Sequence, residues 1–243
     1  MTPGFARSTL HVGEVGSTSD LARSLVEAGG VELPLLVRAD RQTAGRGRGA
    51  NRWWSDDGGL LFTLAVEPSS YGIVAERAPR VALAAAVAIV DAIGVAHVGI
   101  RWPNDVEVCG RKLAGILPEW VVGASGAVML IGVGVNVSTR FEGSPAEVTR
   151  LGASVGEFRQ VDAGALLDAI LSRLGPNLEA VGQGDPGLAA RWAALDTLRG
   201  TPIRVDLGGP VIEGVGDGIA ADGGLWITSA AGRTCLYGGR VLR

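Results

Sequence analysis

Residues 106–137 constrain the fold more than any other part of the chain. The segment "VEVCGRKLAGILPEWVVGASGAVMLIGVGVNV" is rich in Val, Ile and Leu, and its apolar runs are broken at Cys109–Arg111 and at Gly123–Gly126. Glycine and small polar residues at such breaks are typical of tight turns, and strands joined by tight turns pair antiparallel. The segment therefore predicts successive antiparallel strands of one sheet.

The rest of the first 196 residues alternates between strand-like and helix-like patterns. Strands are predicted at residues 8–15, 33–40, 60–67 and 96–102, and helices at residues 17–30, 75–93, 162–182 and 186–196. The first helix has Ser17 or Thr18 as its N-cap and stops at Gly29. Strands and helices in this order predict an α+β domain, a mixed sheet with flanking helices.

The composition changes near residue 197. Residues 203–243 consist of short alternating strands separated by Gly-rich turns, without a helical pattern. A small β-barrel accounts for this pattern, and a barrel of so few residues needs the main domain for its stability. We therefore predict two domains, residues 1–196 and 197–243.

Charge and composition argue against several classes of function. A net charge of −3 with a pI near 5.5 does not suit nucleic-acid binding, which needs an excess of cations. Cys109 and Cys235 lack metal-ligand spacing, and the two histidines form no zinc-type cluster or hydrolytic triad. The N-terminus lacks the apolar core of a signal peptide, and the apolar run 81–94 carries Asp91, which favours a buried helix. A reduced cytoplasmic location without a membrane span is expected.

Of the 22 basic residues, only Lys112 is a lysine. The ordinary surface cation of this chain is therefore Arg, which argues against Lys112 as an inconsequential surface residue. A compact ammonium with three rotatable donors serves sites that a planar guanidinium does not. Lys112 is thus the first candidate for a functional side chain.

The loop "RQTAGRGRGANRWWS", residues 41–55, places arginines among glycines. Glycine lets backbone N–H groups approach an anion, and Arg supplies a fork of donors for carboxylate or phosphate. The match Gly45–Ala50 to a dinucleotide fingerprint lacks the helix that must follow it. A flexible solvated loop and an RNA contact remain as alternatives.

Each of two further segments allows two interpretations, one structural and one functional. "RWPND", residues 101–105, suits a plain turn, or an amide and a carboxylate that face a nucleotide at a strand end. "GVGVNV", residues 132–137, has glycines at alternate positions, which clear one face of a strand for a flat ligand or for close packing.

Four motifs in this order resemble those of the biotin protein ligases. They are "GRGR" with its following Trp and Ser (45–55), "WPND" (102–105), "KLAGIL.E" (112–119) and "GVGVNV" (132–137). "STSDLA" (17–22) after the first strand and the small terminal barrel fit the same family. The resemblance covers nearly the whole chain and implies a class II synthetase-like catalytic domain followed by an SH3-like β-barrel.

The resemblance also implies a reaction and its residues. Members of the family join biotin to ATP as biotinyl-5′-AMP, release pyrophosphate, and transfer biotin to a lysine of a biotin carboxyl carrier domain. Lys112, Arg46 and Arg48 would be catalytic. The biotin site would comprise Ser17, Thr18, Ser19, Gln42, Arg46, Gly47, Arg48, Lys112, Gly115 and Gly132, and the ATP site Arg46, Arg48, Trp53, Asn104, Asp105, Lys112 and Asn136. Mg²⁺ would be required, with ligands that the sequence leaves open.

The chain departs from the family pattern at three points. Ala50-Asn51 replaces the usual Gly-Arg, which removes a donor for phosphate that Arg52 could supply instead. Arg101 replaces the usual Lys before "WPND", which makes the retention of Lys112 more telling. The catalytic domain begins close to the N-terminus, so a ligase without a DNA-binding domain is expected.

Three rival functions follow from the same residues. A lipoate or octanoate ligase or transferase shares the broad fold, but Trp-rich, Gly-lined motifs favour a compact bicyclic head group over a flexible acyl chain. A non-catalytic biotin or adenylate sensor is consistent with Ala50-Asn51. A nucleic-acid-binding module is the third. The resemblance further implies that two copies pair through the catalytic sheet.

Overall fold

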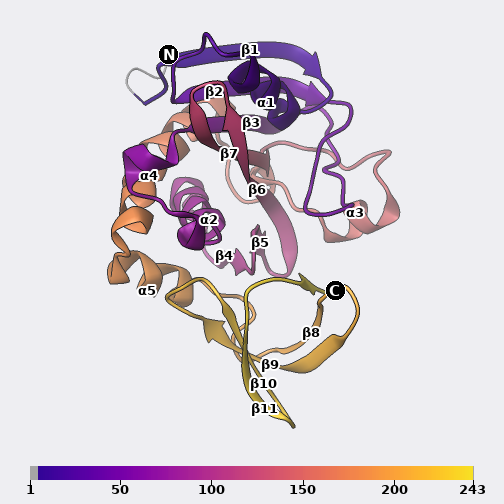
Figure 1. The fold of residues 1–243 in the computed structure, drawn as a ribbon. Helices are drawn as coiled ribbons and strands as arrows, with labels where there is room; N and C mark the ends of the chain where they lie inside the picture. The colour runs from indigo at the N-terminus through magenta and orange to yellow at the C-terminus, as the bar shows by residue number, and fades with distance from the viewer. Residues whose placement is uncertain (1–4, 243) are drawn as a thin grey trace.

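The computed structural model describes residues 5–242 and contains two sheets (Figure 1). The larger has seven strands in the order β1-β2-β3-β7-β6-β5-β4. They are β1 (Ser8–Val15), β2 (Leu35–Gln42), β3 (Gly59–Val66), β4 (Val98–Arg101), β5 (Asp105–Val108), β6 (Arg111–Gly123) and β7 (Gly126–Asn136). Only β1 and β2 pair parallel among these strands, so the predicted mixed sheet is confirmed.

The segment 106–137 forms the antiparallel strands that its pattern predicts. β5 turns into β6 at Cys109 and Gly110, which both have positive φ, and β6 turns into β7 after Gly123. β6 and β7 pair along nearly their whole length, with Gly115 opposite Gly134. The register is important for the site because these two glycines face the same side chain, as described below.

The helices are α1 (Thr18–Ala28), α2 (Arg80–Ile93), α3 (Ala146–Leu151), α4 (Ala163–Gln183) and α5 (Pro186–Ala194). The Ser17 hydroxyl oxygen caps α1 by accepting hydrogen bonds from the N–H groups of Ser19 and Asp20, and Gly29 ends the helix with φ 78°. The short α3 was not predicted from the sequence. No helix among residues 5–242 is both long enough and apolar enough to span a bilayer.

The prediction of one continuous helix over residues 75–93 is wrong in its first turns. Ala75–Arg77 form a separate 3₁₀ turn, and α2 begins at Arg80, directly after Pro79. Ala78 and Pro79 keep helical dihedral angles, but Pro79 has no N–H to donate, so the helical hydrogen-bond ladder is interrupted there.

Helices cover both faces of the larger sheet. α2 and α4 lie on one face, where Leu60, Phe62 and Leu64 of β3 belong to the main apolar core (Figure 1). α1 covers the other face over a smaller cluster that includes Leu35 and Val37 of β2. Burial on both faces explains why these strands are apolar along most of their length.

The C-terminal part forms a second sheet of five strands in the order β11-β10-β9-β8-β12. They are β8 (Pro202–Asp206), β9 (Val211–Ile219), β10 (Leu225–Ser229), β11 (Gly232–Leu236) and β12 (Arg240–Val241). The predicted run of short strands is present. No strand pairing joins β11 to β12 in the part of the chain that the structure describes, so a closed barrel is not shown.

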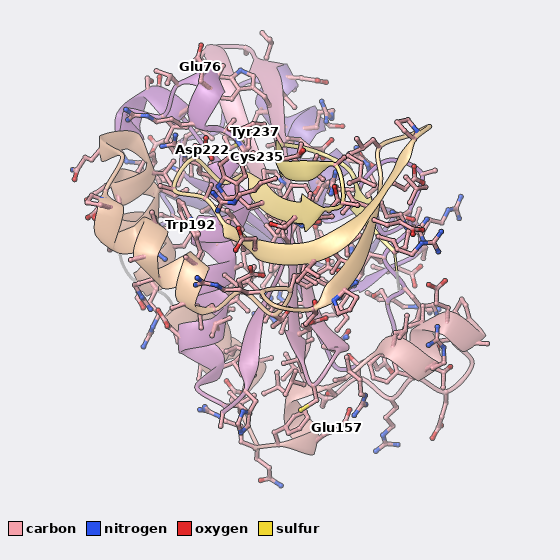
Figure 2. All side chains as sticks on the ribbon, turned by 90° about the horizontal axis from the view of Figure 1, so that it is seen from below. Glu76, Glu157, Trp192, Asp222, Cys235 and Tyr237 are labelled. Atoms are coloured by element: carbon pink, nitrogen blue, oxygen red, sulfur yellow. The ribbon has the colours of Figure 1, made fainter. Side chains whose placement is uncertain are left out.

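Two indole N–H groups from residues before the second sheet donate to backbone carbonyls of the turn between β9 and β10. Trp102 Nε1 donates to the Gly223 oxygen at 2.9 Å, and Trp192 Nε1 donates to the Ala220 oxygen at 3.0 Å. Figure 2 shows Trp192 on α5, at the margin of this sheet. Because buried indole N–H groups are costly to leave unpaired, these bonds fix the position of the second sheet relative to the first.

Asp196, just after α5, has a largely buried carboxyl group near this junction. Its Oδ1 accepts a hydrogen bond from the Leu198 N–H at 2.9 Å, whereas its buried Oδ2 has no partner among the described residues. Burial raises the pKa of Asp196 to about 6, and the charge of nearby Glu107 adds to the rise. The group thus stays partly protonated in the folded protein at pH values where it is ionised in the unfolded chain.

We expect Asp196→Asn to change how stability depends on pH. A carboxyl whose pKa is raised on folding stabilises the fold at low pH, and this contribution is lost as the pH rises from about 4 to about 6. The loss in the wild type amounts to at most about 3 kcal/mol at 1.36 kcal/mol per pKa unit. The variant should therefore gain clearly more melting temperature over the wild type at pH 8 than at pH 4.5, in thermal unfolding at both pH values. Equal gains at both pH values would contradict the assignment.

Candidate functional site

Every site residue named from the sequence lines a single cavity of about 990 Å³. The cavity lies between the N-terminus of α1, the loop after β2, strands β6 and β7, and the second sheet. The named residues around it are Ser17, Thr18, Ser19, Gln42, Arg46, Gly47, Arg48, Trp53, Asn104, Asp105, Lys112, Gly115, Gly132 and Asn136. The structure thus brings together residues that are up to 119 positions apart in the sequence, from 17 to 136.

Hydroxyl and amide groups gather where α1 begins. Gln42 Oε1 accepts hydrogen bonds from the Thr18 N–H at 2.7 Å and from the Thr18 hydroxyl at 3.1 Å. With its oxygen so occupied, the Gln42 side chain offers its NH₂ group to a ligand. Ser17 is held as the helix cap. This end of the cavity therefore presents oriented donors to a small polar head group.

Thr63 is a buried part of this arrangement that sequence reasoning missed. Its Oγ1 lies 2.9 Å from Thr18 Oγ1 and 3.0 Å from Ser19 Oγ, and its side chain is fully buried on β3. Within "GLLFTLAV" it is the only residue with a polar side chain, which is the signal that could have pointed to it. Because buried hydroxyls need partners, Thr63 fixes the orientation of both α1 side chains.

The glycines of β6 and β7 make room for Trp53. A Cβ atom on Gly134 would lie 2.5 Å from the Trp53 ring, and one on Gly115 would lie 3.1 Å from it. A Cβ atom on Gly132 would instead lie 2.6 Å from Ser19 Oγ. Of the two interpretations of these glycines, a flat ligand or close packing, the structure shows close packing, because the chain's own Trp53 indole occupies the space beside Gly134 and Gly115. The ring forms a wall of the cavity.

Lys112 projects from β6 beside this wall. Its Nζ donates to Asp105 Oδ1 at 2.6 Å and lies 5.5 Å from the centre of the Trp53 ring. Its backbone oxygen accepts hydrogen bonds from the Ala153 N–H at 2.9 Å and from Asn136 Nδ2 at 3.2 Å. The lysine is thus fixed at its backbone and at its ammonium group, which keeps N–H donors for a further anion.

The predicted turn at "WPND" is present and also borders the cavity. Asn104 Nδ2 donates to the Ile116 oxygen at 2.8 Å, and the Ile116 N–H donates to the Asn104 backbone oxygen at 2.9 Å. The turn is therefore tied to β6 near Lys112. Asn104 uses its side-chain NH₂ group in the bond to Ile116, and Asn136 uses its own in the bond to Lys112. In both residues the side-chain oxygen is left as an acceptor.

Arg46 and Arg48 differ in their surroundings. Arg46 is ion-paired with Glu119 and Asp20, and the hydrogen bond with Glu119 raises its pKa. Arg48 has no carboxylate within ion-pair distance among the described residues and donates to the Gly239 oxygen at 3.1 Å. Burial lowers the pKa of Arg48 against the opposing charge of Asp105. Arg48 remains charged at neutral pH and is the arginine prepared for an added anion.

The second sheet and the α3 region also line the cavity, which the sequence did not predict. Their lining residues are Phe141, Glu147, Val148, Leu151, Gly152, Arg204, Asp206, Leu207, Gly208, Gly239, Arg240, Val241 and Leu242. Nothing in a single sequence indicates which residues of a distant sheet will meet a loop, so no signal for them was available.

Comparison with known proteins identifies the family. Residues 13–136 match the Biotin/lipoate A/B protein ligase family. The chain is 31% identical to a biotin--[acetyl-CoA-carboxylase] ligase of Paracoccus denitrificans, over 90% of this chain and 95% of that protein, and 30% identical to one of Mycobacterium tuberculosis, over 93% and 84%.

A bifunctional ligase/repressor of Bacillus spizizenii is 33% identical over 65% of this chain, and the chain spans about half, 49%, of its length. A biotin protein ligase from Aquifex aeolicus, in complex with biotin and ATP, superposes with a TM-score of 0.80 over 97% of this chain and 98% of that one, at 24% identity, which shows a shared fold. From the family match and the two relatives aligned along most of their length, the chain belongs to the Biotin/lipoate A/B protein ligase family and, within it, to the biotin protein ligases.

Proposed function

We propose that the protein activates biotin with ATP and transfers it to a lysine of a biotin carboxyl carrier domain. The observation that carries this proposal is the position of Lys112, the chain's one lysine, in a cavity with head-group donors at one end. Arg48, which has no carboxylate partner within residues 5–242, lines the same cavity. The names of the relatives, biotin--[acetyl-CoA-carboxylase] ligases, support the substrate.

In the first step a carboxylate oxygen of biotin attacks the α-phosphorus of ATP. An acyl–phosphate bond forms, the bond to the β-phosphate oxygen breaks, and pyrophosphate leaves with the electron pair. The biotin carboxylate and the α-phosphate of ATP are both anionic and must approach each other. Cations held in position between them therefore account for most of the lowering of the activation barrier. The Lys112 ammonium would bridge the carboxylate and the α-phosphate, and Arg48 would bind the negative charge of the acyl-adenylate.

In the second step the neutral amine of the acceptor lysine attacks the acyl carbonyl. The new amide bond forms, AMP leaves with the electron pair of the acyl–phosphate bond, and the amine loses a proton to solvent. At the other end, Ser17, Thr18 and Gln42 would hold the ureido group of biotin, since their oxygens and the Gln42 NH₂ offer both acceptors and donors. Trp53, Asn104 and Asn136 would border the adenylate.

Mg²⁺ would enter with ATP as part of the substrate. Residues 5–242 contain no group of three or more His, Cys, Asp or Glu side chains placed to hold a metal ion. Near Lys112 the cavity offers one carboxylate, Asp105, and the side-chain oxygens of Asn104 and Asn136, and Glu147 and Asp206 are further carboxylates of its lining. Mg²⁺ is commonly held by a single carboxylate together with substrate phosphates, and these residues fit that mode.

Four finer points belong to the same proposal. The C-terminal sheet would be of the SH3-like kind, with a domain boundary near residue 197 that falls between α5 and β8. The protein would act in the cytoplasm, and two copies would pair through the larger sheet.

Pyrophosphate exchange tests the activity directly. We expect purified protein to exchange labelled pyrophosphate into ATP only when biotin is present, because exchange requires reversible formation of the acyl-adenylate. We also expect biotin to raise the melting temperature and lipoate to leave it unchanged, since a site with head-group donors and an indole wall suits a bicyclic ring. Stabilisation by lipoate or octanoate alone would favour the acyl-chain enzymes of the family.

A non-catalytic biotin-binding homologue is the second candidate. Ala50-Asn51 replaces a Gly-Arg pair, and the backbone of Asn51 closes a tight turn, because its backbone oxygen accepts the Gly47 N–H at 2.9 Å. This turn has one phosphate donor fewer than the family pattern. Biotin binding without any pyrophosphate exchange would support this candidate.

A further inference from the structure

Arg46 is held in a network of carboxylates. Its two Nη groups donate to the two oxygens of Glu119 at 2.6 and 3.0 Å, and Nη1 also donates to Asp20 Oδ1 at 2.8 Å. Paired donors on one carboxylate form a bidentate bond, the stronger and more directional kind of ion pair. The guanidinium of Arg46 is thereby fixed between β6, which carries Glu119, and α1, which carries Asp20.

Glu119 is itself held in place from two directions. Its backbone pairs with Leu130 of β7, and its Oε1 accepts a further hydrogen bond from Arg23 Nη2 at 2.9 Å. The side chain is 16% exposed, so solvent screens the network less than a surface ion pair. One sheet residue thus receives three guanidinium N–H bonds, and nothing in the reaction described above uses it.

The loop segment 45–52 has few other attachments. Its internal bonds close a small turn between Gly47 and Asn51, and an isolated bridge joins Arg46 to Arg52. Outward side-chain hydrogen bonds of this segment to the rest of the described structure come from Arg46 and Arg48 alone, with Arg48 reaching Gly239 beside β12. The segment therefore spans the cavity between two anchors, and Glu119 forms most of the first.

We propose that Glu119 is a positioning residue that clamps Arg46 and so holds segment 45–52 closed over the cavity, which retains the acyl-adenylate until the acceptor arrives. The identity of the retained molecule rests on the proposed function, whereas the clamp rests on the contacts alone. While clamped, Arg46 has both Nη groups engaged. Its part is therefore to anchor the loop, and Arg48 is left as the loop's anion-binding arginine.

Glu119→Gln tests the clamp without any ligand. The amide removes the charge but keeps the shape, and it leaves Arg23 and Arg46 to repel each other with only Asp20 beside them. We expect the backbone amides of residues 47–53 in the full chain to exchange hydrogen about tenfold faster, the size of a lost charge-assisted bond. Asp20→Asn, which removes one exposed bond, should give a smaller increase of about two- to threefold.

Glu14→Gln is the matched control. Glu14 pairs with Arg41 at 3.4 Å, near the start of the same loop, and both side chains are more than half exposed. We expect no change in exchange at residues 47–53 from this variant, since the pair does not touch Arg46. Unchanged exchange in Glu119→Gln, or an equal rise in Glu14→Gln, would overturn the clamp.

The second readout is release of the adenylate. In single-turnover reactions without acceptor, Glu119→Gln should release biotinyl-5′-AMP three- to tenfold faster than wild type, because a looser loop opens more often. Faster loop exchange with unchanged release would overturn the retention role. A lower KM for ATP would overturn the assignment of Arg46 as an anchor, since it would show that Glu119 withholds Arg46 from phosphate. If wild type forms no adenylate, the proposed function fails and the exchange experiment still decides the clamp.

Discussion

Lys112→Ala is expected to reduce biotin-dependent pyrophosphate exchange by about 100- to 1000-fold, the cost of removing one group that stabilises charge in a transition state. The ammonium is ordered by Asp105 at 2.6 Å, and its backbone is tied to Asn136 and Ala153, so it is positioned before substrates bind. Such preorganisation is what makes an electrostatic contribution large. The loss should fall on kcat more than on KM, because the bridge between carboxylate and α-phosphate tightens as the bond forms.

Two control variants separate the role of Lys112 from general charge loss. Lys112→Arg keeps the charge but cannot place one small group between two oxygens, so we expect it to restore little activity. Arg41→Ala removes an exposed cation that pairs with Glu14 and does not line the cavity, and it should leave exchange near the wild-type rate. Circular dichroism should show the same fold in all three. Near-normal exchange by Lys112→Ala or by Lys112→Arg would refute the bridging role.

What the sequence predicts well are features determined by neighbouring residues. The hairpins of 106–137, the cap at Ser17 and the helix stop at Gly29 each depend on a few adjacent side chains and on glycine conformations. The one clear error, the continuous helix from residue 75, arose because Ala-rich periodicity outweighed the local effect of Pro79.

What the sequence does not predict depends on contacts between distant segments. The hydroxyl of Thr63 meets α1 only because β3 lies under that helix, and Glu119 meets Arg46 across 73 positions. The lining supplied by the second sheet depends on how that sheet docks, through bonds such as Trp102 to Gly223. The motif residues could be named from the sequence, whereas the groups that orient them could not.

The difference between Arg46 and Arg48 illustrates this limit. In the sequence they are equivalent members of "GRGR", and both are predicted to be catalytic and to belong to the biotin and ATP sites. In the structure one is neutralised by Glu119 and the other is half-buried with no carboxylate partner in the described chain. Burial without a partner is costly for a cation, which indicates that Arg48 is compensated when an anion binds.

Gly134→Ala is expected to be the most damaging single methyl group that can be added to the site. The new Cβ would lie 2.5 to 2.8 Å from three atoms of the Trp53 indole, which is far shorter than a van der Waals contact. The ring must therefore move away from β7, the strand against which it packs. Trp53 forms a wall of the cavity, and its ring centre lies 5.5 Å from the Lys112 ammonium. Displacement of the ring therefore changes both the shape of the cavity and the surroundings of Lys112. We expect biotin affinity by calorimetry to fall at least about tenfold, with a stability cost of about 1–3 kcal/mol typical of overpacking.

Relief of the clash by a second substitution shows whether the ring is the cause. Trp53→Phe removes the indole nitrogen and shortens the ring system, so the double variant should lose less affinity than the sum of the two single losses. Gly13→Ala on β1, where an added Cβ meets nothing within 4 Å, controls for the effect of alanine at a strand glycine and should bind biotin normally. Additive losses in the double variant would mean that Gly134 and Trp53 act independently. In that case the space that Gly134 leaves for the Trp53 indole would not be the reason for the loss of affinity.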